Sequence, residues 1–268
     1  NPLFVEHTNP PEGEVGFSRN LIVLEPHSEV TLVERMSSES NASGGFVTNL
    51  TNAIIGEGAK LRRILIQDFN SKVTLHNLEN FDLMKDSKLT NVSLHLGCAE
   101  ARLETKGSIL KSGAEFENFS LALGQRDQLI DLRTMQHHLA SNGRSNLVCK
   151  NALLDQSKSI FSGMIKVENE ARFTDALQTN RNLLMSDEAE ADSMPGLEIS
   201  ANEVKCSHGA TTSRIDEQEL FYLLSRGIKK KNAEKLIALG FFEEIVEKIG
   251  LDEQLELARN LITQKFVS

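Results

Sequence analysis

The sequence is poor in the residues on which single-strand nucleic-acid binders depend. Its 268 residues include no tryptophan and a single tyrosine, whereas such binders stack bases on aromatic side chains. The net charge of −9 at pH 7 also disfavours a polyanionic partner. The one compact basic run, residues 229–231, is typical of a solvated helix face. We therefore expect no nucleic-acid partner.

Cysteines are also few, and their spacing excludes two common uses. Cys98, Cys149 and Cys206 lie far apart, and no CxxC pattern occurs. Neither a disulfide framework nor a structural zinc site is indicated, and a reducing compartment fits best. No run approaches the ~18 apolar residues of a membrane span, and residues 1–4 do not resemble a signal peptide. We favour the bacterial cytoplasm and expect no membrane contact, although a plastid with its transit peptide removed stays open.

Sequence motifs of common enzyme classes are absent too. No GxxxxGK[ST] phosphate loop, GxGxxG, GxSxG, HExxH or EF-hand loop occurs. An ATPase or a dinucleotide enzyme therefore has no support, although catalytic groups can still converge from distant segments.

What the sequence does contain, from Leu21 to Cys206, is short apolar or β-branched runs alternating with clusters of Gly, Ser, Asn, Asp and Lys. This pattern predicts strands separated by turns. Almost none of the runs is joined by an Asn-Gly or Asp-Gly hairpin turn. The predicted strands include residues 21–24, 30–33, 61–66, 72–75, 89–96, 116–123, 159–167 and 197–199.

A turn phrase recurs between these strands: a polar turn with a small residue precedes the next apolar run. It occurs at residues 57–61, 85–89, 111–116, 155–160 and 168–173. The first three copies begin at 57, 85 and 111, hence 28 and 26 residues apart. Repeats of this length indicate a solenoid, whose coils bury their apolar edges against one another. An antiparallel sandwich with similar turns stays open on this pattern alone.

After Gly209 the periodicity becomes helical. Asp216 to Glu219 has the form of a helix start, and Gly227 is a stop signal. Further helices are predicted at 230–239 before Gly240, at 242–249 before Gly250, and at 252–267, whose apolar stripe is Leu255, Ala258, Leu261 and Ile262. The tail is too short to bury these faces alone. We expect it to pack on the β-domain, on a partner, or on both.

Two groups of side chains could bind a metal. His137 and His138 are adjacent, so on a strand they point to opposite faces and make poor joint ligands. Cys206 and His208 have one residue between them, which places thiol and imidazole on the same face, and both are good ligands for iron or zinc. Two ligands do not complete a metal site. A buried thiol beside a hydrogen-bonded histidine, or a Cys-His nucleophilic pair, stays open on spacing alone.

The stretch LEISANEVKCSHGATT at residues 197–212, with LFYL at 220–223 and SRGI at 225–228, resembles the C-terminal signature of the SufB/SufD family of iron–sulfur cluster assembly proteins. Residues 131–134, 138, 145–146, 161–167 and 178–184 continue the resemblance. Where the SufB branch carries a Glu after the shared histidine, this chain has Gly209, and the SufB cysteine falls near Asn180. The resemblance is therefore to the SufD branch.

That resemblance implies a mainly β fold: a right-handed parallel β-helix over residues 1–212 with a C-terminal helical region at 213–268. It further implies a non-catalytic scaffold that pairs with a SufB-like subunit and docks the SufC-like ATPase through the helical region. His208, with Cys206 beside it, is implied to lie near an interface where a transient iron–sulfur cluster is shared with SufB, and His208 is the implied iron ligand.

Two other functions remain. A homodimer of this chain could hold iron or a cluster by itself, because two copies of Cys206 and His208 facing across a two-fold axis supply four ligands. A carbohydrate-active β-helix enzyme is the alternative of another class. Such enzymes need clustered carboxylates in a groove, and the acidic stretch 187–192 is instead typical of solvated surface.

Overall fold

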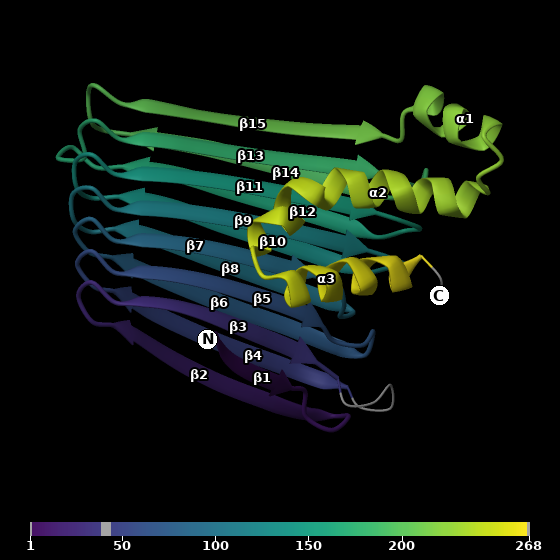
Figure 1. The fold of residues 1–268 in the computed structure, drawn as a ribbon, viewed down its shortest axis with the longest axis horizontal. Helices are drawn as coiled ribbons and strands as arrows, with labels where there is room; N and C mark the ends of the chain where they lie inside the picture. The colour runs from purple at the N-terminus through teal and green to yellow at the C-terminus, as the bar shows by residue number, and fades with distance from the viewer. Residues whose placement is uncertain (1, 39–43, 267–268) are drawn as a thin grey trace.

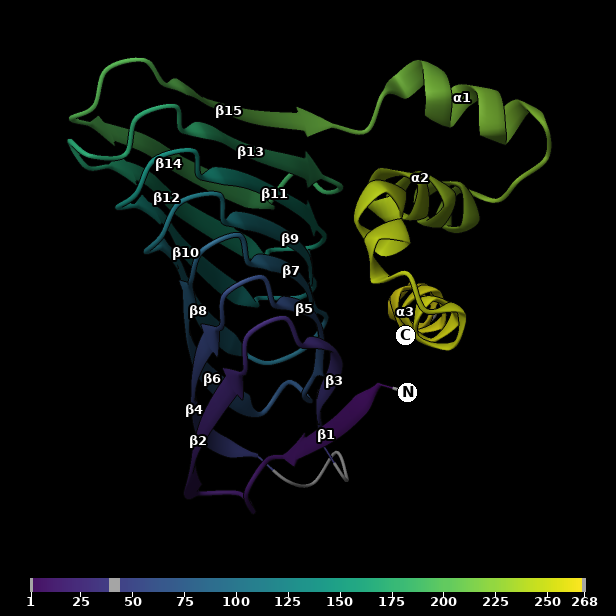
Figure 2. The same ribbon diagram turned by 60° about the vertical axis from the view of Figure 1, so that its left-hand side comes forward.

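The structure is a computed structural model that describes residues 2–38 and 44–266. Its core consists of two parallel β-sheets whose strands alternate along the chain, odd-numbered strands in sheet A and even-numbered strands in sheet B. Figures 1 and 2 show the sheets facing each other as the two walls of a solenoid. Sheet A consists of β1 (Leu3–Thr8), β3 (Glu29–Ser37), β5 (Lys60–Asp68), β7 (Lys88–His95), β9 (Glu115–Gly124), β11 (Arg144–Leu153), β13 (Asp175–Leu184) and β15 (Lys205–Arg214). Sheet B consists of β2 (Glu14–Leu24), β4 (Gly45–Ile55), β6 (Val73–Leu83), β8 (Glu100–Ile109), β10 (Leu129–His138), β12 (Lys158–Val167) and β14 (Glu190–Ile199).

Each strand pairs in parallel with the strand two positions along the chain, so every circuit of the solenoid stacks on the previous one. Lys60 of β5, for example, is the ladder partner of Lys88 in β7. The predicted parallel β-helix is thus confirmed, and the antiparallel sandwich is wrong. Every predicted strand lies within or overlaps an observed one.

The turns that lead from sheet B to sheet A repeat as well. Each contains one residue with a left-handed backbone: His27, Gly58, Asp86, Gly113, Asn142, Phe173 and Glu203. In five of these turns the amide of this residue donates to the turn of the next coil, as from Gly58 to the Lys85 carbonyl (2.8 Å); the five residues are His27, Gly58, Asp86, Asn142 and Phe173. Four of the recurring turn phrases occupy these positions, whereas residues 155–160 form a turn at the opposite edge, between β11 and β12. Stacked turns hold successive coils in register.

The solenoid interior contains buried charge as well as apolar side chains. Arg63 is fully buried and forms ion pairs with Glu34 of β3 and with Glu79 of β6, the latter at 2.8 Å between Nη1 and Oε1. Burial opposes ionisation of Glu34, but the charges and hydrogen bonds of Arg63 and His7 together outweigh burial and lower the pKa of that carboxyl to about 2. This cluster ties both walls together, because its members come from both sheets.

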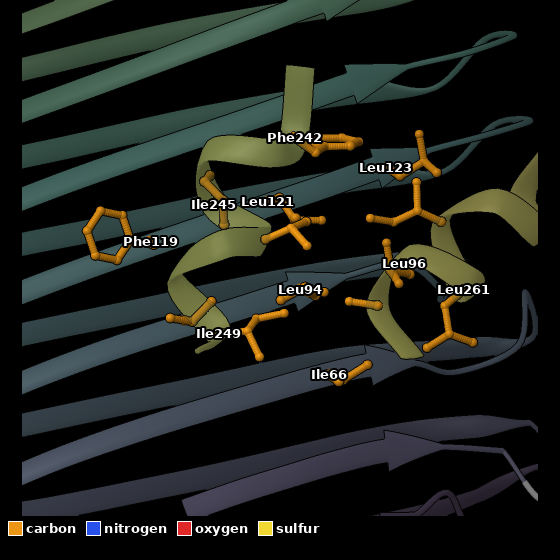
Figure 3. Packing of buried hydrophobic residues seen from close by; sticks show 14 of the residues in the cluster. Ile66, Leu94, Leu96, Phe119, Leu121, Leu123, Phe242, Ile245, Ile249 and Leu261 are labelled. Carbon is orange, nitrogen blue, oxygen red and sulfur yellow. The ribbon is translucent and has the colours of Figure 1, made fainter. Parts of the chain in front are cut away.

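Three α-helices follow the last strand: α1 (Glu217–Ser225), α2 (Lys230–Val246), which leads into the 3-10 turn η1 (Glu247–Ile249), and α3 (Asp252–Lys265). In Figure 2, α2 and α3 lie against the outer face of sheet A, while α1 lies beyond the end of β15. Phe242 and Ile245 of α2, with Ile249, pack on Leu94, Leu121 and neighbouring side chains of β7 and β9 (Figure 3). Polar contacts reinforce this packing: Lys150 of β11 donates to the Phe241 carbonyl at 2.8 Å and pairs with Glu244 at 2.7 Å.

The helical expectations are confirmed except around Gly240. Asp216 caps α1 by accepting from the amide of Gln218 at 2.7 Å, and the stripe on α3 faces the sheet. The predicted stop at Gly240 is wrong, and so is the separate helix predicted at 242–249, because α2 continues through Gly240 to Val246 and only 247–249 form the turn η1. Glycine inside a helix costs only about 1 kcal/mol, which burial of Phe242 and Ile245 against sheet A offsets. The predicted end of the last helix at Val267 falls outside the described residues. Among the described residues, no helix combines the length and apolar character needed to cross a membrane.

Replacing Phe242 with alanine tests how firmly the helices hold to sheet A. Phe242→Ala should lower the free energy of unfolding by about 3–5 kcal/mol, because it leaves a cavity in a fully buried cluster. Phe221→Ala, at a side chain that is 71% exposed on α1, is the matched control and should change it by less than about 0.5 kcal/mol. Urea denaturation followed by circular dichroism measures both. Equal effects would mean that the helices do not pack on the sheet.

Candidate functional site

Within the described residues, the solenoid ends in a coil with no further coil stacked on it. β15 is the last strand of sheet A and β14 the last strand of sheet B, and each pairs with a strand on one side only. An edge strand presents unpaired backbone N–H and C=O groups, which can pair with another chain. The last coil therefore offers two adjacent strand edges at one end of the molecule (Figure 1).

The side chains of this coil are of the kind that the coils below keep buried. Leu197 and Ile199 of β14 are ladder partners of Ile165 and Val167, both fully buried. Leu197 and Ile199 face the same interior but are 38% and 40% exposed, because no further coil in the described part of the chain covers them. The end of the solenoid is an unfinished core whose apolar residues are in contact with water.

Cys206 and His208 lie on the same interior-facing side of β15. Their ladder partners in β13 are Ala176 and Gln178, both buried, whereas Leu177 between them points outward and is 42% exposed. Cys206 is half-buried against a small apolar cluster that includes Ile165 and Ala176, and His208 is exposed. The structure therefore brings together the two site residues that the sequence singled out.

The chemistry of this pair suits a shared site. Burial raises the pKa of the Cys206 thiol, and the nearby Asp175 carboxylate raises it further. A metal ligand must be a thiolate, so Cys206 would bind iron only with the help of an approaching positive charge. Among the described residues, no group of three or more His, Cys, Asp and Glu side chains could hold a metal. The two donors fit part of a ligand set, and the remainder would have to come from elsewhere.

A hydrogen-bonded polar layer lies beside this pair. Asn180 and Asn182 of β13 both donate to the hydroxyl of Ser193 in β14, at 2.7 and 3.1 Å. Asn182 also donates to Thr212 of β15 at 3.2 Å. These bonds link both walls of the last coil and fix its shape. Sequence reasoning noted Asn180 only as the position of a SufB cysteine; the alternation of polar residues at 178, 180 and 182 was the signal for an inward-facing polar row.

The other candidate side chains lie elsewhere in structural roles. His138 is buried, and its Nε2 lies 2.7 Å from the Ser145 hydroxyl, while His137 on the opposite face is half-buried and pairs with Glu168 at 2.9 Å. Cys98 and Cys149 are buried inside the solenoid, and burial raises the pKa of Cys149 to about 12. The adjacent histidines point to opposite faces, as the sequence predicts.

Helix α1 is a second exposed surface next to the last coil. None of its residues is buried, and Phe221 and Tyr222 are 71% and 57% exposed. The helix begins at Glu217, directly after β15 ends at Arg214. Tyr222 and Leu223 line a hollow of about 400 Å3 that Ile237 of α2 closes on its other side. An apolar helix face without cover is typical of an interaction site.

Comparisons with known proteins identify relatives of this chain. Residues 6–241 match the family model described as "SUF system FeS cluster assembly, SufBD core domain". The chain is 34% identical over 245 residues to the iron–sulfur cluster assembly protein SufD of Escherichia coli, which covers 90% of this chain and 57% of that protein. It is 28% identical to SufD of Bacillus subtilis, over 88% of this chain and 54% of the relative.

A third relative is an iron–sulfur cluster assembly SufBD family protein of Mycobacterium tuberculosis, 29% identical over 95% of this chain and 65% of its own length. The chain therefore spans less than two thirds of the length of these curated relatives.

The buried histidine predicts a specific acid sensitivity. Burial, with a smaller contribution from the charge of neighbouring His137, lowers the pKa of His138 to about 4. The unfolded chain therefore binds more protons than the folded one between about pH 6.5 and 4, and stability falls as pH falls through that window. Between pH 7 and pH 4, His138→Leu should therefore lose on the order of 3 kcal/mol less of its free energy of unfolding than the wild type. The Ser145 hydroxyl still has a hydrogen-bond partner in this variant, because it accepts from Gln136. Urea unfolding at pH 7 and pH 4 measures it. An unchanged pH slope in His138→Leu would contradict the assignment.

Proposed function

This chain belongs to the SufBD family of iron–sulfur cluster assembly proteins and is SufD-like, and from that membership we propose that it is a non-catalytic scaffold subunit of the SUF assembly complex. The observation that carries the proposal is the unfinished last coil, which presents core-type apolar side chains, two strand edges and two metal-binding side chains together. Three free cysteines, two of them buried, suit the reducing cytoplasm in which we place it.

The partner at this end is a SufB-like subunit with the same solenoid architecture. A second parallel solenoid can add its own edge strands to β14 and β15, so that backbone groups pair along the edge. Its coil would then cover Leu197 and Ile199 as a further coil of this chain would. Cys206 and His208 would lie between the two subunits, with the missing ligands supplied by the partner and by sulfide.

The iron–sulfur cluster is the cargo of this interface. Imidazole nitrogen and thiolate sulfur are both suitable iron ligands, and His208 is the more accessible of the two. We assign His208 as the iron ligand. Cys206 lies beside it as a thiol, and a change at the interface could convert that thiol to a thiolate. The chain itself supplies surface and ligands and performs no turnover.

The SufC-like ATPase docks on α1. Phe221 and Tyr222 provide the exposed aromatic anchors that dominate protein interfaces. Because α1 follows β15 with only two residues between them, force applied to α1 acts next to the open coil. ATP hydrolysis in the docked subunit would thereby change the interface that holds the cluster.

The ligand role is tested by His208→Ala. The variant should assemble with SufB-like and SufC-like subunits as the wild type does, because His208 is exposed and removal of its ring leaves no buried cavity. Iron and sulfide content after anaerobic reconstitution should fall at least roughly tenfold. Loss of a residue that only supports a metal ligand already lowers metal affinity by that factor, and loss of the ligand itself should cost no less. His76→Ala, at a half-buried histidine on the outer face of sheet B, is the control. Equal cluster content in wild type and His208→Ala would rule out the ligand role, and failure to form any complex would rule out the scaffold.

The docking surface is tested by Ile199→Glu. A charge at this inward-facing position should weaken SufB-like binding by roughly 10- to 100-fold, because it removes about 1.5–3 kcal/mol of apolar burial. Met194→Glu, on the outward face of the same strand and 58% exposed, should leave binding unchanged. Biolayer interferometry measures both.

The same pair of variants also tests the homodimer. If the isolated chain is a dimer that Ile199→Glu dissociates while SufB-like binding is unaffected, the open coil serves a second copy of this chain instead. Native mass spectrometry of the two variants and the wild type decides between these outcomes.

The helix is tested separately. Phe221→Ala should weaken binding of the SufC-like subunit by roughly 30-fold or more, as for an interface hot spot, and should leave SufB-like binding intact. Leu236→Ala, at a 45% exposed apolar residue of α2, is the control. Retained SufC-like binding in Phe221→Ala would exclude α1 as the docking surface.

A further inference from the structure

Gln178 lies directly beneath His208 inside the solenoid. It belongs to β13, where it is the ladder partner of His208, and both side chains face the interior. His208 is exposed at the open end, whereas Gln178 is fully buried one coil below. No side chain stands between the two positions in this column of sheet A.

The amide of Gln178 has no hydrogen-bond partner in the part of the chain that the structure describes. Neither its Oε1 nor its Nε2 is satisfied, although a buried amide without partners is costly. The side chain crosses to sheet B, where a Cβ at Gly163 would lie 2.6 Å from the amide. Gly163 thus leaves the space that the amide occupies, and a larger residue there would displace it.

The column below Gln178 cannot satisfy the amide. The residue directly below Gln178 is Leu147, which is buried and apolar. The coils farther from the open end place Asn118, Asn91 and Arg63 in the same column. Leu147 therefore separates Gln178 from the polar residues deeper in the solenoid. Within the column, the one side chain next to Gln178 that can form a hydrogen bond is His208.

We propose that Gln178 is a positioning residue for His208. When a partner covers the last coil, Gln178 Oε1 accepts a hydrogen bond from one ring N–H of His208, and the other ring nitrogen is left to bind iron. Metal-binding histidines commonly donate their second ring N–H to a carbonyl or carboxylate, which fixes the tautomer and the ring orientation. This inference rests on the proposed function, because it assigns a role to the neighbour of the proposed ligand.

Two substitutions at this position separate a positioning role from a packing role. Gln178→Met keeps a similar length and removes the acceptor, whereas Gln178→Glu keeps the acceptor. Gln67→Met is the control, since Gln67 is an equally buried glutamine in β5 that donates to Cys98. In the assembled complex, Gln178→Met should lower iron affinity by about 10- to 100-fold, measured by chelator competition. Gln178→Glu should restore most of it, and Gln67→Met should match the wild type.

A spectroscopic measurement reads the hydrogen bond itself, independently of the cluster. The ring 15N shifts of His208 in the metal-free complex should report one tautomer in the wild type and in Gln178→Glu. They should report a mixture of tautomers in Gln178→Met. A purely structural role for Gln178 would not change the tautomer of a histidine in the neighbouring strand.

The outcomes distinguish this inference from the proposed function. If His208→Ala keeps its cluster, the ligand role fails, and the tautomer measurement alone decides whether Gln178 bonds to His208. If His208→Ala loses the cluster while Gln178→Met keeps both the cluster and the single tautomer, the ligand role stands and the inference is overturned. Gln178 would then be satisfied by a buried water shared with the Thr134 hydroxyl, which also lacks a partner among the described residues.

Discussion

The in-register parallel ladder is the constraint on which the rest of this structure depends. Each strand completes its backbone pairing only with the coils before and after it, and each coil buries its interior only against its neighbours. A solenoid built this way has no means of closing its own ends. Exposure of Leu197, Ile199 and His208 at the end of sheets A and B therefore follows directly from the architecture.

The helical tail leaves that end open and covers a face instead. α2 and α3 pack on the outside of sheet A, where the apolar cluster of β7 and β9 and Lys150 of β11 hold them (Figure 3). α1 contributes nothing to this packing, since none of its residues is buried. At this end of the solenoid the last coil and α1 are thus both uncovered and lie close together. Their proximity is the physical basis for the proposed coupling between an ATPase subunit and the cluster site.

Sequence patterns predicted much of this, for reasons that particular residues make clear. Alternating or β-branched runs such as 159–167 mark strands because one face is buried, and the turn phrases fall where a left-handed residue is needed. The helix α2 was predicted too short because Gly240 is a local stop signal, whereas burial of Phe242 is a tertiary effect. The tail was expected to pack on the β-domain, on a partner, or on both, and the structure shows α2 and α3 on sheet A. Which face they cover was not predicted, although the uninterrupted apolar run Ile64, Leu65 and Ile66 signals a strand buried on both faces.

The candidate site divides in the same way. The spacing of Cys206 and His208 was enough to place them on one face, because strand geometry has a period of two. The contact between Gln178 and Gly163 could not be predicted from strand spacing. It joins opposite walls of the solenoid and depends on the register of both sheets. The Arg63 cluster was hidden for the same reason: its carboxylates come from β3 and β6.

Hydrogen–deuterium exchange of this chain, alone and with a SufB-like subunit, tests the central claim that the last coil is an unfinished core completed by a partner. The account predicts new protection of the amides of β14 and β15, with none on β8, the middle strand of sheet B. Unchanged exchange in β14 and β15 together with protection elsewhere would contradict it, and would move the partner surface away from His208.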